Sequence, residues 1–342
     1  MKGSVIINGV DIADFGAFIL RGGDNDLLTM PERKQPKMTS WYEYDGIDAD
    51  LSEVYFNERK VKIDFYLSAD NARDYEYRLN EFYRLITSGY ITMYSREFDR
   101  TFNYRYLSCP DFEHKGGFYK SGDKRGKFTV EFSMDDPLQL FNDPTILQPR
   151  KLGSFLASET AFILTDDGLF VDIGDALAVD SHISHVALNG IDLGAFGIIV
   201  NECYSSMLKL PATKTPLTRS FARRSGLQAY TSESPKFEAK ELVINCTMRA
   251  ASRAEFYWNY EALFNNLTKP EALQIDSYLG RADCYYNKME DFKKLGIFSR
   301  GVLVSFTLKL IQIDPAFTFH VLGSASDTAI LTDANEYILY QN

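Results

Sequence analysis

The sequence predicts an α+β fold in which a mostly antiparallel β unit with one packed helix occurs twice in tandem. Three observations support this prediction. The phrase NGVDIADFG at residues 8–16 returns as NGIDLGAFG at 189–197, an offset of 181 residues. A strand pattern followed by a helix pattern recurs at the same offset, and each half ends its last strand at Asp-Pro. With 342 residues the chain is long enough for two domains.

Each unit is expected to begin with a β-hairpin, because Asn-Gly between apolar residues is the strongest short signal for a two-residue turn. A polar loop follows the hairpin. The markers of this loop match at an offset of 180, with Pro31, Pro36, Ser40 and Gly46 corresponding to Pro211, Pro216, Ser220 and Gly226.

A strand with one buried face comes next, since apolar residues now alternate with mostly polar ones. The apolar positions are Val61, Ile63, Phe65 and Leu67 in the first half and Leu242, Ile244, Cys246 and Met248 in the second. Cys246 stands where Phe65 stands in the first half. We therefore interpret Cys246 as a core residue and not as a nucleophile.

Amphipathic helices are predicted over residues 71–88 and 252–268, and their apolar stripes coincide at the offset of 181. The stripes are Tyr75, Leu79, Phe82 and Ile86, and Phe256, Tyr260, Leu263 and Leu267. Ser252 and Glu255 form a capping-box pattern, which marks a helix start. Gly89 and Pro270 mark the ends. We expect the two helices to superpose and to cover equivalent sheets.

The closing strands contain Phe128, Val130 and Phe132 in the first half and Phe306, Leu308 and Leu310 in the second. Their Asp-Pro ends, at residues 136–137 and 314–315, are offset by 178 residues. A net loss of three residues in an intervening loop explains the change, because loops tolerate deletions.

The chain is thereby divided into two units of β-sandwich or split-barrel type and two additions. The units are residues 1–143 and 186–317, the connector is 144–185, and the C-terminal extension is 318–342. The connector contains LTDDGLF at 164–170 and the extension contains LTDANEY at 331–337. We expect both additions to form short hairpins or extended segments.

Composition excludes several classes of protein. With 45% hydrophobic and 25% charged residues the chain is typical of a globular protein, and no apolar run reaches the length of a membrane span. Polar Asn8 and Asp11 come too early for a secretion signal, so synthesis in a cytoplasm is expected. No cysteine pair forms CxxC, and reduced thiols are expected at Cys109, Cys203, Cys246 and Cys284.

The net charge of −10 argues against tight nucleic-acid binding. Residues 1–150 have 20 basic and 25 acidic side chains, residues 151–185 have 1 and 6, and residues 186–342 have 16 and 16. No region therefore has the clustered Lys and Arg that a phosphate backbone requires.

No motif indicates catalysis, so no catalytic, cofactor-binding or metal-binding residue is assigned and the protein is not expected to be an enzyme. GxGxxG, GxxxxGK[ST] and GxSxG are all missing from the sequence. None of the histidines stands in a suggestive context, these being His114, His182, His185 and His320. A carboxylate pair brought together by the fold stays open, although nothing in the sequence points to one.

Metal binding is also disfavoured. His182 and His185 have helical ligand spacing but no third ligand nearby. Two acidic clusters have the close spacing of calcium loops without the order of an EF-hand, and we interpret them as solvated loop charge. They comprise Asp45, Asp48 and Asp50, and Asp166, Asp167, Asp172 and Asp175.

Aromatic residues make up 14% of the chain. Many alternate along predicted strands, as Phe98, Phe102, Tyr104 and Tyr106 do, and sheet packing explains them. Tyrosines exposed on loops would instead suit a protein interface, which we favour, or a sugar-stacking platform.

The opening NG[VI]D[IL]xxFG hairpin, the proline-containing loop, the strand, the Asp74-Tyr75-x-x-x-Leu79-x-x-Phe82 helix and the final Asp136-Pro137 together resemble the N-terminal domain of phage distal tail proteins. The resemblance covers residues 1–143 and again 186–317. It implies a non-catalytic protein of the virion tail that forms a ring and joins the tail tube to the hub and the receptor-binding proteins. The family usually has a different C-terminal domain, whereas here a second ring-type unit follows.

Two kinds of function follow from these observations. The first is a structural tail-tip component of a phage or prophage, self-associating as a trimeric pseudo-hexamer or as a hexamer. The alternative is a carbohydrate- or surface-binding module that uses loop tyrosines such as those at Tyr104 and Tyr106.

Overall fold

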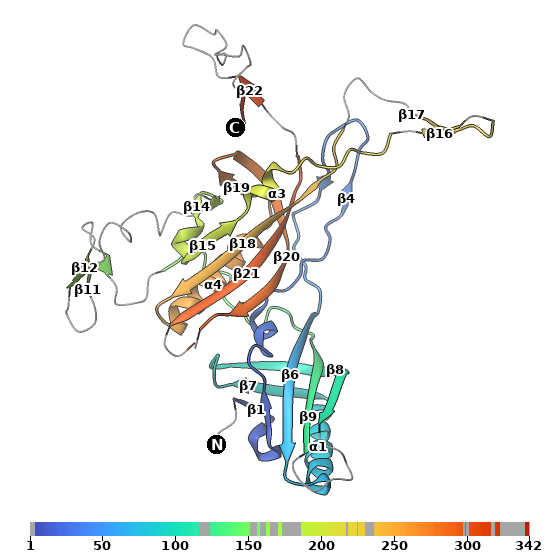
Figure 1. The fold of residues 1–342 in the computed structure, drawn as a ribbon. Coiled ribbons are helices and arrows are strands. Elements are labelled where there is room, and N and C mark those ends of the chain that lie inside the picture. The colour runs from blue at the N-terminus through green and yellow to red at the C-terminus, as the bar shows by residue number, and fades with distance from the viewer. Residues whose placement is uncertain are drawn as a thin grey trace.

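The computed structural model describes residues 4–115, 124–150, 156–157, 162–164, 170–172, 186–216, 218–223, 225–229, 236–296, 298, 301–315, 319–321 and 339–341. Two seven-stranded antiparallel sheets dominate it, and one long helix accompanies each sheet (Figure 1). No helix among these residues has the length and hydropathy needed to cross a membrane. The predicted mostly antiparallel architecture is therefore confirmed.

The first unit contains the sheet of order β2-β1-β7-β8-β9-β6-β3. Its elements are β1 (Val5–Ile7), β2 (Val10–Asp11), η1 (Ile12–Phe15), β3 (Ala17–Ile19), η2 (Asn25–Leu28), β4 (Met38–Thr39), β5 (Asp48–Ala49), β6 (Arg59–Ala69), α1 (Ala72–Ile86), β7 (Tyr90–Ser95), β8 (Arg100–Lys115) and β9 (Lys124–Met134).

The second unit contains the sheet of order β14-β13-β19-β20-β21-β18-β15. Its elements are β13 (Val186–Leu188), β14 (Ile191–Asp192), η3 (Leu193–Phe196), β15 (Ile198–Glu202), α3 (Tyr204–Leu208), β16 (Thr218–Ser220), β17 (Leu227–Ala229), β18 (Lys240–Ala250), α4 (Arg253–Leu267), β19 (Leu273–Ser277), β20 (Gly280–Lys294) and β21 (Val302–Gln312).

The two sheets have the same order when strands are matched by their place in the sequence. The start of β18 follows the start of β6 by 240 − 59 = 181 residues, and β21 follows β9 by 302 − 124 = 178. The change of offset read from the sequence therefore falls between these two pairs of strands. Each long helix directly follows its equivalent strand, as predicted.

The Asn-Gly turns form in both units. Asn8 and Asn189 have φ of 48° and 51°, the left-handed conformation that a type I′ hairpin turn requires. Each asparagine also fixes the neighbouring strand, because its side-chain oxygen accepts a hydrogen bond from the main chain there. The donors are the amides of Thr92, at 2.8 Å, and Gln274, at 2.9 Å.

The helices begin and end in the same way in both units. The side chains of Asn71 and Ser252 accept hydrogen bonds from the third residue of each helix, and these caps satisfy amides that have no partner within the helix. Of the eight predicted stripe residues, seven are buried and Leu79 is half-buried against the core. The predicted boundaries are accurate to within two residues at either end.

Each sheet folds over on itself, which gives the sandwich-like layering seen in Figure 1. Strand β8 pairs with β7 through residues 100–105 and with β9 from residue 105 onward. Register shifts beyond Tyr106 let the strand turn between these two partners. The alternating residues of β6 and β18 fill the space beneath, and Cys246 is buried there as predicted.

Short strands also occur in the connector and the C-terminal extension. The strands β10 (Leu156–Ala157), β11 (Phe162–Leu164) and β12 (Phe170–Asp172) form a small antiparallel sheet. Strands β22 (Phe319–Val321) and β23 (Leu339–Gln341) pair as another. Both additions thus contain the short extended segments that were expected.

Candidate functional site

The two units are packed against each other, and this joint is the most elaborate feature among the described residues. Helix α4 of the second unit lies at its centre. The segment that leaves the first unit, residues 141–150, runs along α4, and asparagine side chains of the helix hold its main chain. Asn265 donates to the carbonyls of Asp143 and Ile146, and Asn266 donates to that of Leu147.

Aromatic side chains fill the rest of this contact. The rings of Phe141 and Phe264 stack with their centres 3.9 Å apart, and Phe56 lies 5.4 Å from Phe264. The indole nitrogen of Trp258 donates to the carbonyl of Gln148 at 2.9 Å. The start of the predicted connector is therefore part of the packed structure.

Helices α1 and α4 differ because only α4 is covered on both sides. Eight of its residues are buried, including Ala262 and Phe264 outside the predicted stripe. Only three residues of α1 are buried, and its outer face leaves Tyr77 65% exposed. A helix that is apolar all round is one that packs on both faces.

A buried ion cluster also joins the units. The ammonium of Lys294, at the end of β20, lies 2.8 Å from the carboxylates of both Asp24 and Glu97 in the first unit. The Asp24 and Lys294 side chains are 7% and 10% exposed. Burial raises the pKa of Asp24, and the charge of Lys294 opposes this. Each charge therefore depends on the other for its solvation.

Three tyrosines of the second unit donate their hydroxyls to carbonyls of the first unit. Tyr257 donates to Phe98, Tyr260 to Leu28 and Tyr286 to Pro31. Burial raises the pKa of all three hydroxyls, so they remain protonated donors at neutral pH. No sequence pattern identified these residues as partners across the joint.

A long excursion of the first unit, residues 31–57, crosses to the second unit, and we call it the first arm. Its base is a two-stranded ladder in which Lys34 donates to the carbonyl of Tyr55. Its tip is held by main-chain bonds from Gly46 to Phe237, at 2.9 Å, and from Ile47 to Ile313, at 3.0 Å.

Side chains fasten the same tip. Asp45 accepts from the amide of Phe237 and lies 3.6 Å from the ammonium of Lys236. Lys214 donates to the carbonyl of Trp41. The interpretation of Asp45 as solvated charge was wrong, because this carboxylate is half-buried in a contact between the units. Asp48 and Asp50 are exposed, as expected.

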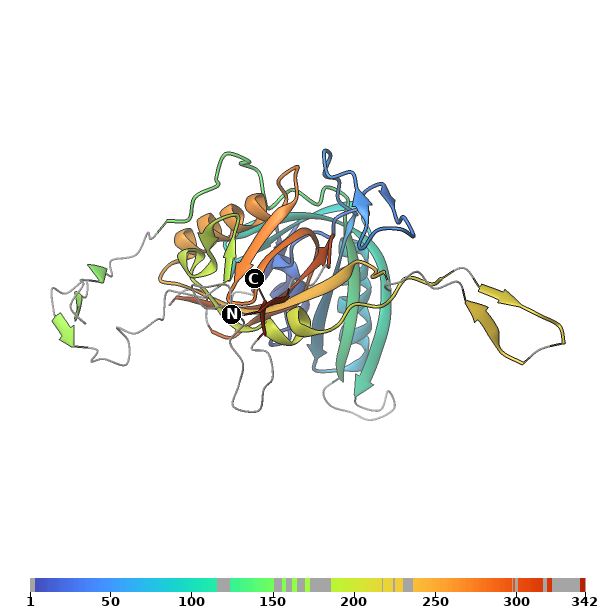
Figure 2. The same ribbon diagram turned by 90° about the horizontal axis from the view of Figure 1, so that it is seen from above.

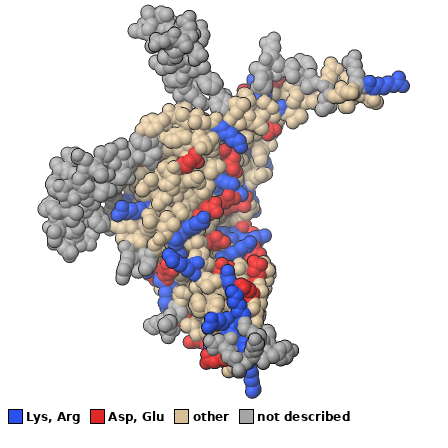
Figure 3. Space-filling model, viewed as in Figure 1, with Lys and Arg blue, Asp and Glu red and all other residues tan. Residues whose placement is uncertain are grey.

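The equivalent excursion of the second unit, residues 211–238, is the second arm. Its base has the matching ladder, in which Lys214 donates to the carbonyl of Lys236. Strands β16 and β17 form its outer hairpin, which projects beyond both sheets in the two perpendicular views (Figures 1 and 2). Residues 218–220 are all exposed. Lys and Arg gather at the end of this arm (Figure 3).

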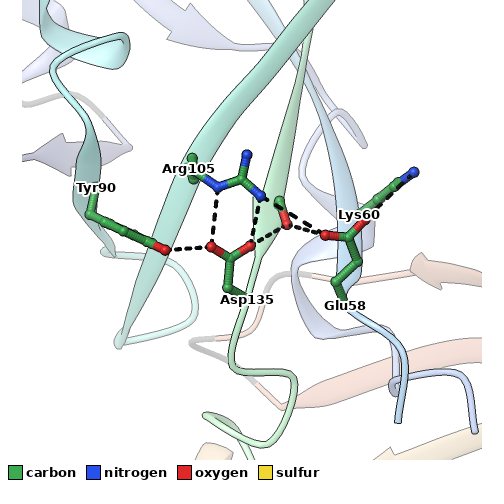
Figure 4. Close-up of polar contacts among 6 residues, drawn as sticks. Glu58, Lys60, Tyr90, Arg105 and Asp135 are labelled. Carbon is green, nitrogen blue, oxygen red and sulfur yellow. Dashed lines mark hydrogen bonds and ion pairs between the residues drawn. The ribbon is translucent and has the colours of Figure 1, made fainter.

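A cluster of charged side chains lies on the first unit beside the base of the first arm (Figure 4). Arg105 donates two hydrogen bonds to Asp135, and Tyr90 adds a third at 2.6 Å. Glu58 lies 4.0 Å from Arg105 and 3.8 Å from Lys60. The bonds from Arg105, Tyr90 and Ser133 hold the pKa of Asp135 well below its usual range. The carboxylate is therefore fixed in its charged form and is poorly suited to proton transfer.

The described residues offer no catalytic chemistry that we can identify. All four cysteines are free, and three are buried. Burial raises the pKa of Cys203 to about 11, so its thiol is not a thiolate at neutral pH. Within the described ranges no cluster of three or more His, Cys, Asp or Glu side chains is placed to hold a metal ion.

The other residues considered from the sequence are scattered. His114 lies on β8 with its ring 5.3 Å from that of Tyr75, and His320 lies on β22. Asp172 lies on β12. The remaining candidates fall outside the described residues, namely His182, His185, Asp166, Asp167 and Asp175.

The suggestion of a sugar-stacking platform at Tyr104 and Tyr106 was wrong. Both lie on strand β8 and not on a loop. Tyr104 is fully buried, with its ring centre 5.7 Å from that of Phe132, and Tyr106 is packed against the core. The two-residue spacing places Phe102 and Tyr104 on the same inward face of the strand.

Comparisons with known proteins agree with the architecture. Residues 12–134 match the family model described as phage tail protein RIFT-related domain. No curated protein sequence matches the chain. Among solved structures, the chain is similar to SPP1 Dit, described as a paradigm of the hub adsorption apparatus in phages that infect Gram-positive bacteria. The identity is 16% and the TM-score 0.29, over 39% of this chain and 50% of that one.

The chain thus spans about half of the length of SPP1 Dit. The family match begins at Ile12, directly after the opening hairpin, and ends at Met134, the last residue of β9. It therefore covers most of the segment on which the sequence resemblance was based. The resemblance to phage distal tail proteins is confirmed, and this chain is a phage tail protein with a RIFT-related domain over residues 12–134.

Proposed function

We propose that this chain is a structural component of a phage or prophage tail tip and assembles into a ring that joins the tail tube to the baseplate. The tail-family match of residues 12–134 supports this proposal. The joint supports it as well, because head-to-tail packing of like units is the kind of contact that closes into rings. The protein is made in the cytoplasm of the bacterial host and ends in the virion tail.

We further propose that residues 1–143 and 186–317 are copies of one sandwich or split-barrel domain produced by tandem duplication. The shared strand order, turns and caps support this. Residues 144–185 then connect the copies, and residues 318–342 extend the second one. Six similar positions in a ring are provided by three chains, and six chains provide two levels or two concentric rings.

The proposed role is mechanical and not enzymatic. Its partners are further copies of the chain and the tube, hub and receptor-binding proteins of the tail. Light scattering coupled to size-exclusion chromatography of the purified full chain, together with negative-stain images, tests the proposal. Closed rings are expected. A chain that stays monomeric and is also missing from the tail tip of virions would refute it.

A further inference from the structure

The two arms occupy equivalent places in their units, yet only the first arm is docked. Lys214, at the base of the second arm, is 8% exposed because the tip of the first arm covers it. Its counterpart Lys34, at the base of the first arm, is exposed. The counterpart of Lys236 is Tyr55, which is 59% exposed. The first unit therefore has an arm-docking position that this chain leaves open.

The tip of the second arm carries the residue that docking requires. At Gly46 a Cβ atom would lie 1.9 Å from the carbonyl oxygen of Ile313, so only glycine fits against the second unit there. Gly226 occupies the equivalent place in the second arm, and a Cβ atom on it would meet nothing within 4 Å. The second arm thus has the small residue of a docking tip without a surface opposite it.

The charges of the arms are opposite. The first arm has three basic and six acidic residues, and its tip docks on Lys214 and Lys236. The second arm has five basic residues and two acidic ones. A position that accepts the second arm is therefore expected to be acidic.

The open position on the first unit is acidic where the occupied one is neutral. Three carboxylates, those of Glu32, Glu58 and Asp135, stand at places held in the second unit by Ala212, Ala239 and Ile313. All three acidic residues are exposed. Glu58 and Asp135 belong to the cluster drawn in Figure 4.

We propose that the second arm of one chain docks on the first unit of another copy, against the base of the first arm and the cluster around Asp135. This proposal rests on the ring assembly proposed above and names the segments that make the contact. Gly226 then lies on the main chain of Asp135, and Ser225 lies next to Tyr55, as Asp45 lies next to Lys236 within the chain.

The contact between copies is more polar than the joint within the chain. The outer face of α1 has charged and polar residues where α4 has the apolar ones of the joint, and the covering of α4 is not expected to be repeated there. Contacts formed between chains that fold separately are typically polar at their rim. Association should therefore weaken with added salt.

Crosslinking between two single-cysteine variants tests the proposal. Full-length chains with Ser225→Cys are mixed with chains with Tyr55→Cys, both in a Cys109→Ser background, and treated with a short bismaleimide. We expect crosslinked dimers of the two variants. The matched control replaces Tyr55→Cys with Tyr77→Cys, because Tyr77 is similarly exposed but lies on α1. Equal yields from the two mixtures, or none from either, overturn the proposal.

Charge reversal supplies a second measurement that keeps the fold intact. Arg219→Glu with Arg223→Glu, both at exposed places on the second arm, should weaken association at least about tenfold. Arg73→Glu at the start of α1 is the control and should have no such effect. Rings that persist in the double variant and give no Ser225–Tyr55 crosslink would refute the arm contact while leaving the ring itself intact. Loss of rings from the unaltered chain refutes the ring.

Discussion

Replacing Lys294 with methionine should break the joint between the units. The substitution Lys294→Met keeps most of the apolar stem and removes an ammonium that lies 2.8 Å from both Asp24 and Glu97. Removing one partner of a buried ion pair costs about 3–5 kcal/mol. Glu97 is 32% exposed and can turn to water, so the lower end, about 3 kcal/mol, is expected.

The assay uses Trp258, whose indole lies in the joint under Arg150. With Trp41→Phe as background, urea unfolding followed by tryptophan fluorescence reports on this contact alone. The double variant Asp24→Asn with Lys294→Met should recover most of the loss, because no charge is then left buried. A loss below about 1 kcal/mol in the single variant would refute the view that the cluster holds the units together.

The same variant should have a distinctive pH dependence. Burial already raises the pKa of Asp24 above its ordinary value of 3.8, and removing Lys294 raises it further. A carboxyl with a raised pKa in the folded state favours folding at low pH, and this contribution is lost as the pH rises through that pKa. The destabilisation should therefore be greatest at neutral pH and shrink as the pH falls towards 4. An equal loss at both pH values would contradict this explanation.

Three further predictions concern the same contacts. Gly46→Ala should destabilise the chain by about 1–3 kcal/mol more than Gly226→Ala, because both residues have positive φ but only Gly46 faces a carbonyl, and urea unfolding measures the difference. Phe264→Ala should cost about 3–5 kcal/mol, and the equivalent Tyr83→Ala clearly less, since Phe264 stacks on Phe141. Above about pH 10 the joint should weaken, because burial raises the pKa of Tyr257 and Tyr260, so their contribution is complete below the ordinary value of 10.0 and is lost as the pH rises further. A Trp258 signal unchanged up to the pH of global unfolding would contradict the last of these.

Local patterns were enough to predict the repeated elements. Strand alternation, helix stripes and caps depend on residues a few positions apart, so β6, α1 and their counterparts were found with accurate limits. The Asn-Gly phrase predicted the hairpins for the same reason. Tyr104 was misjudged because its place on an alternating strand, which indicates burial, was given less weight than its aromatic character.

The joint and the docked arm were missed because they depend on contacts between distant residues. Asp45 and Lys236 are 191 positions apart, and neither stands in a pattern that names the other. One signal was present in the sequence: α4 has Ala262 and Phe264 outside its stripe, where α1 has Glu81 and Tyr83. That difference indicates a helix covered on two sides. The open docking position could be recognised only after the first arm was seen in place.

Class averages of tail tips that contain this chain test the ring most directly. Particles from an induced prophage or purified virions would be imaged after the chain is labelled at its N-terminus. The proposed assembly predicts a closed ring of six similar lobes, with three labels if each chain supplies two neighbouring positions and six if there are two levels. Tail tips in which the labelled chain forms no ring would contradict the proposal.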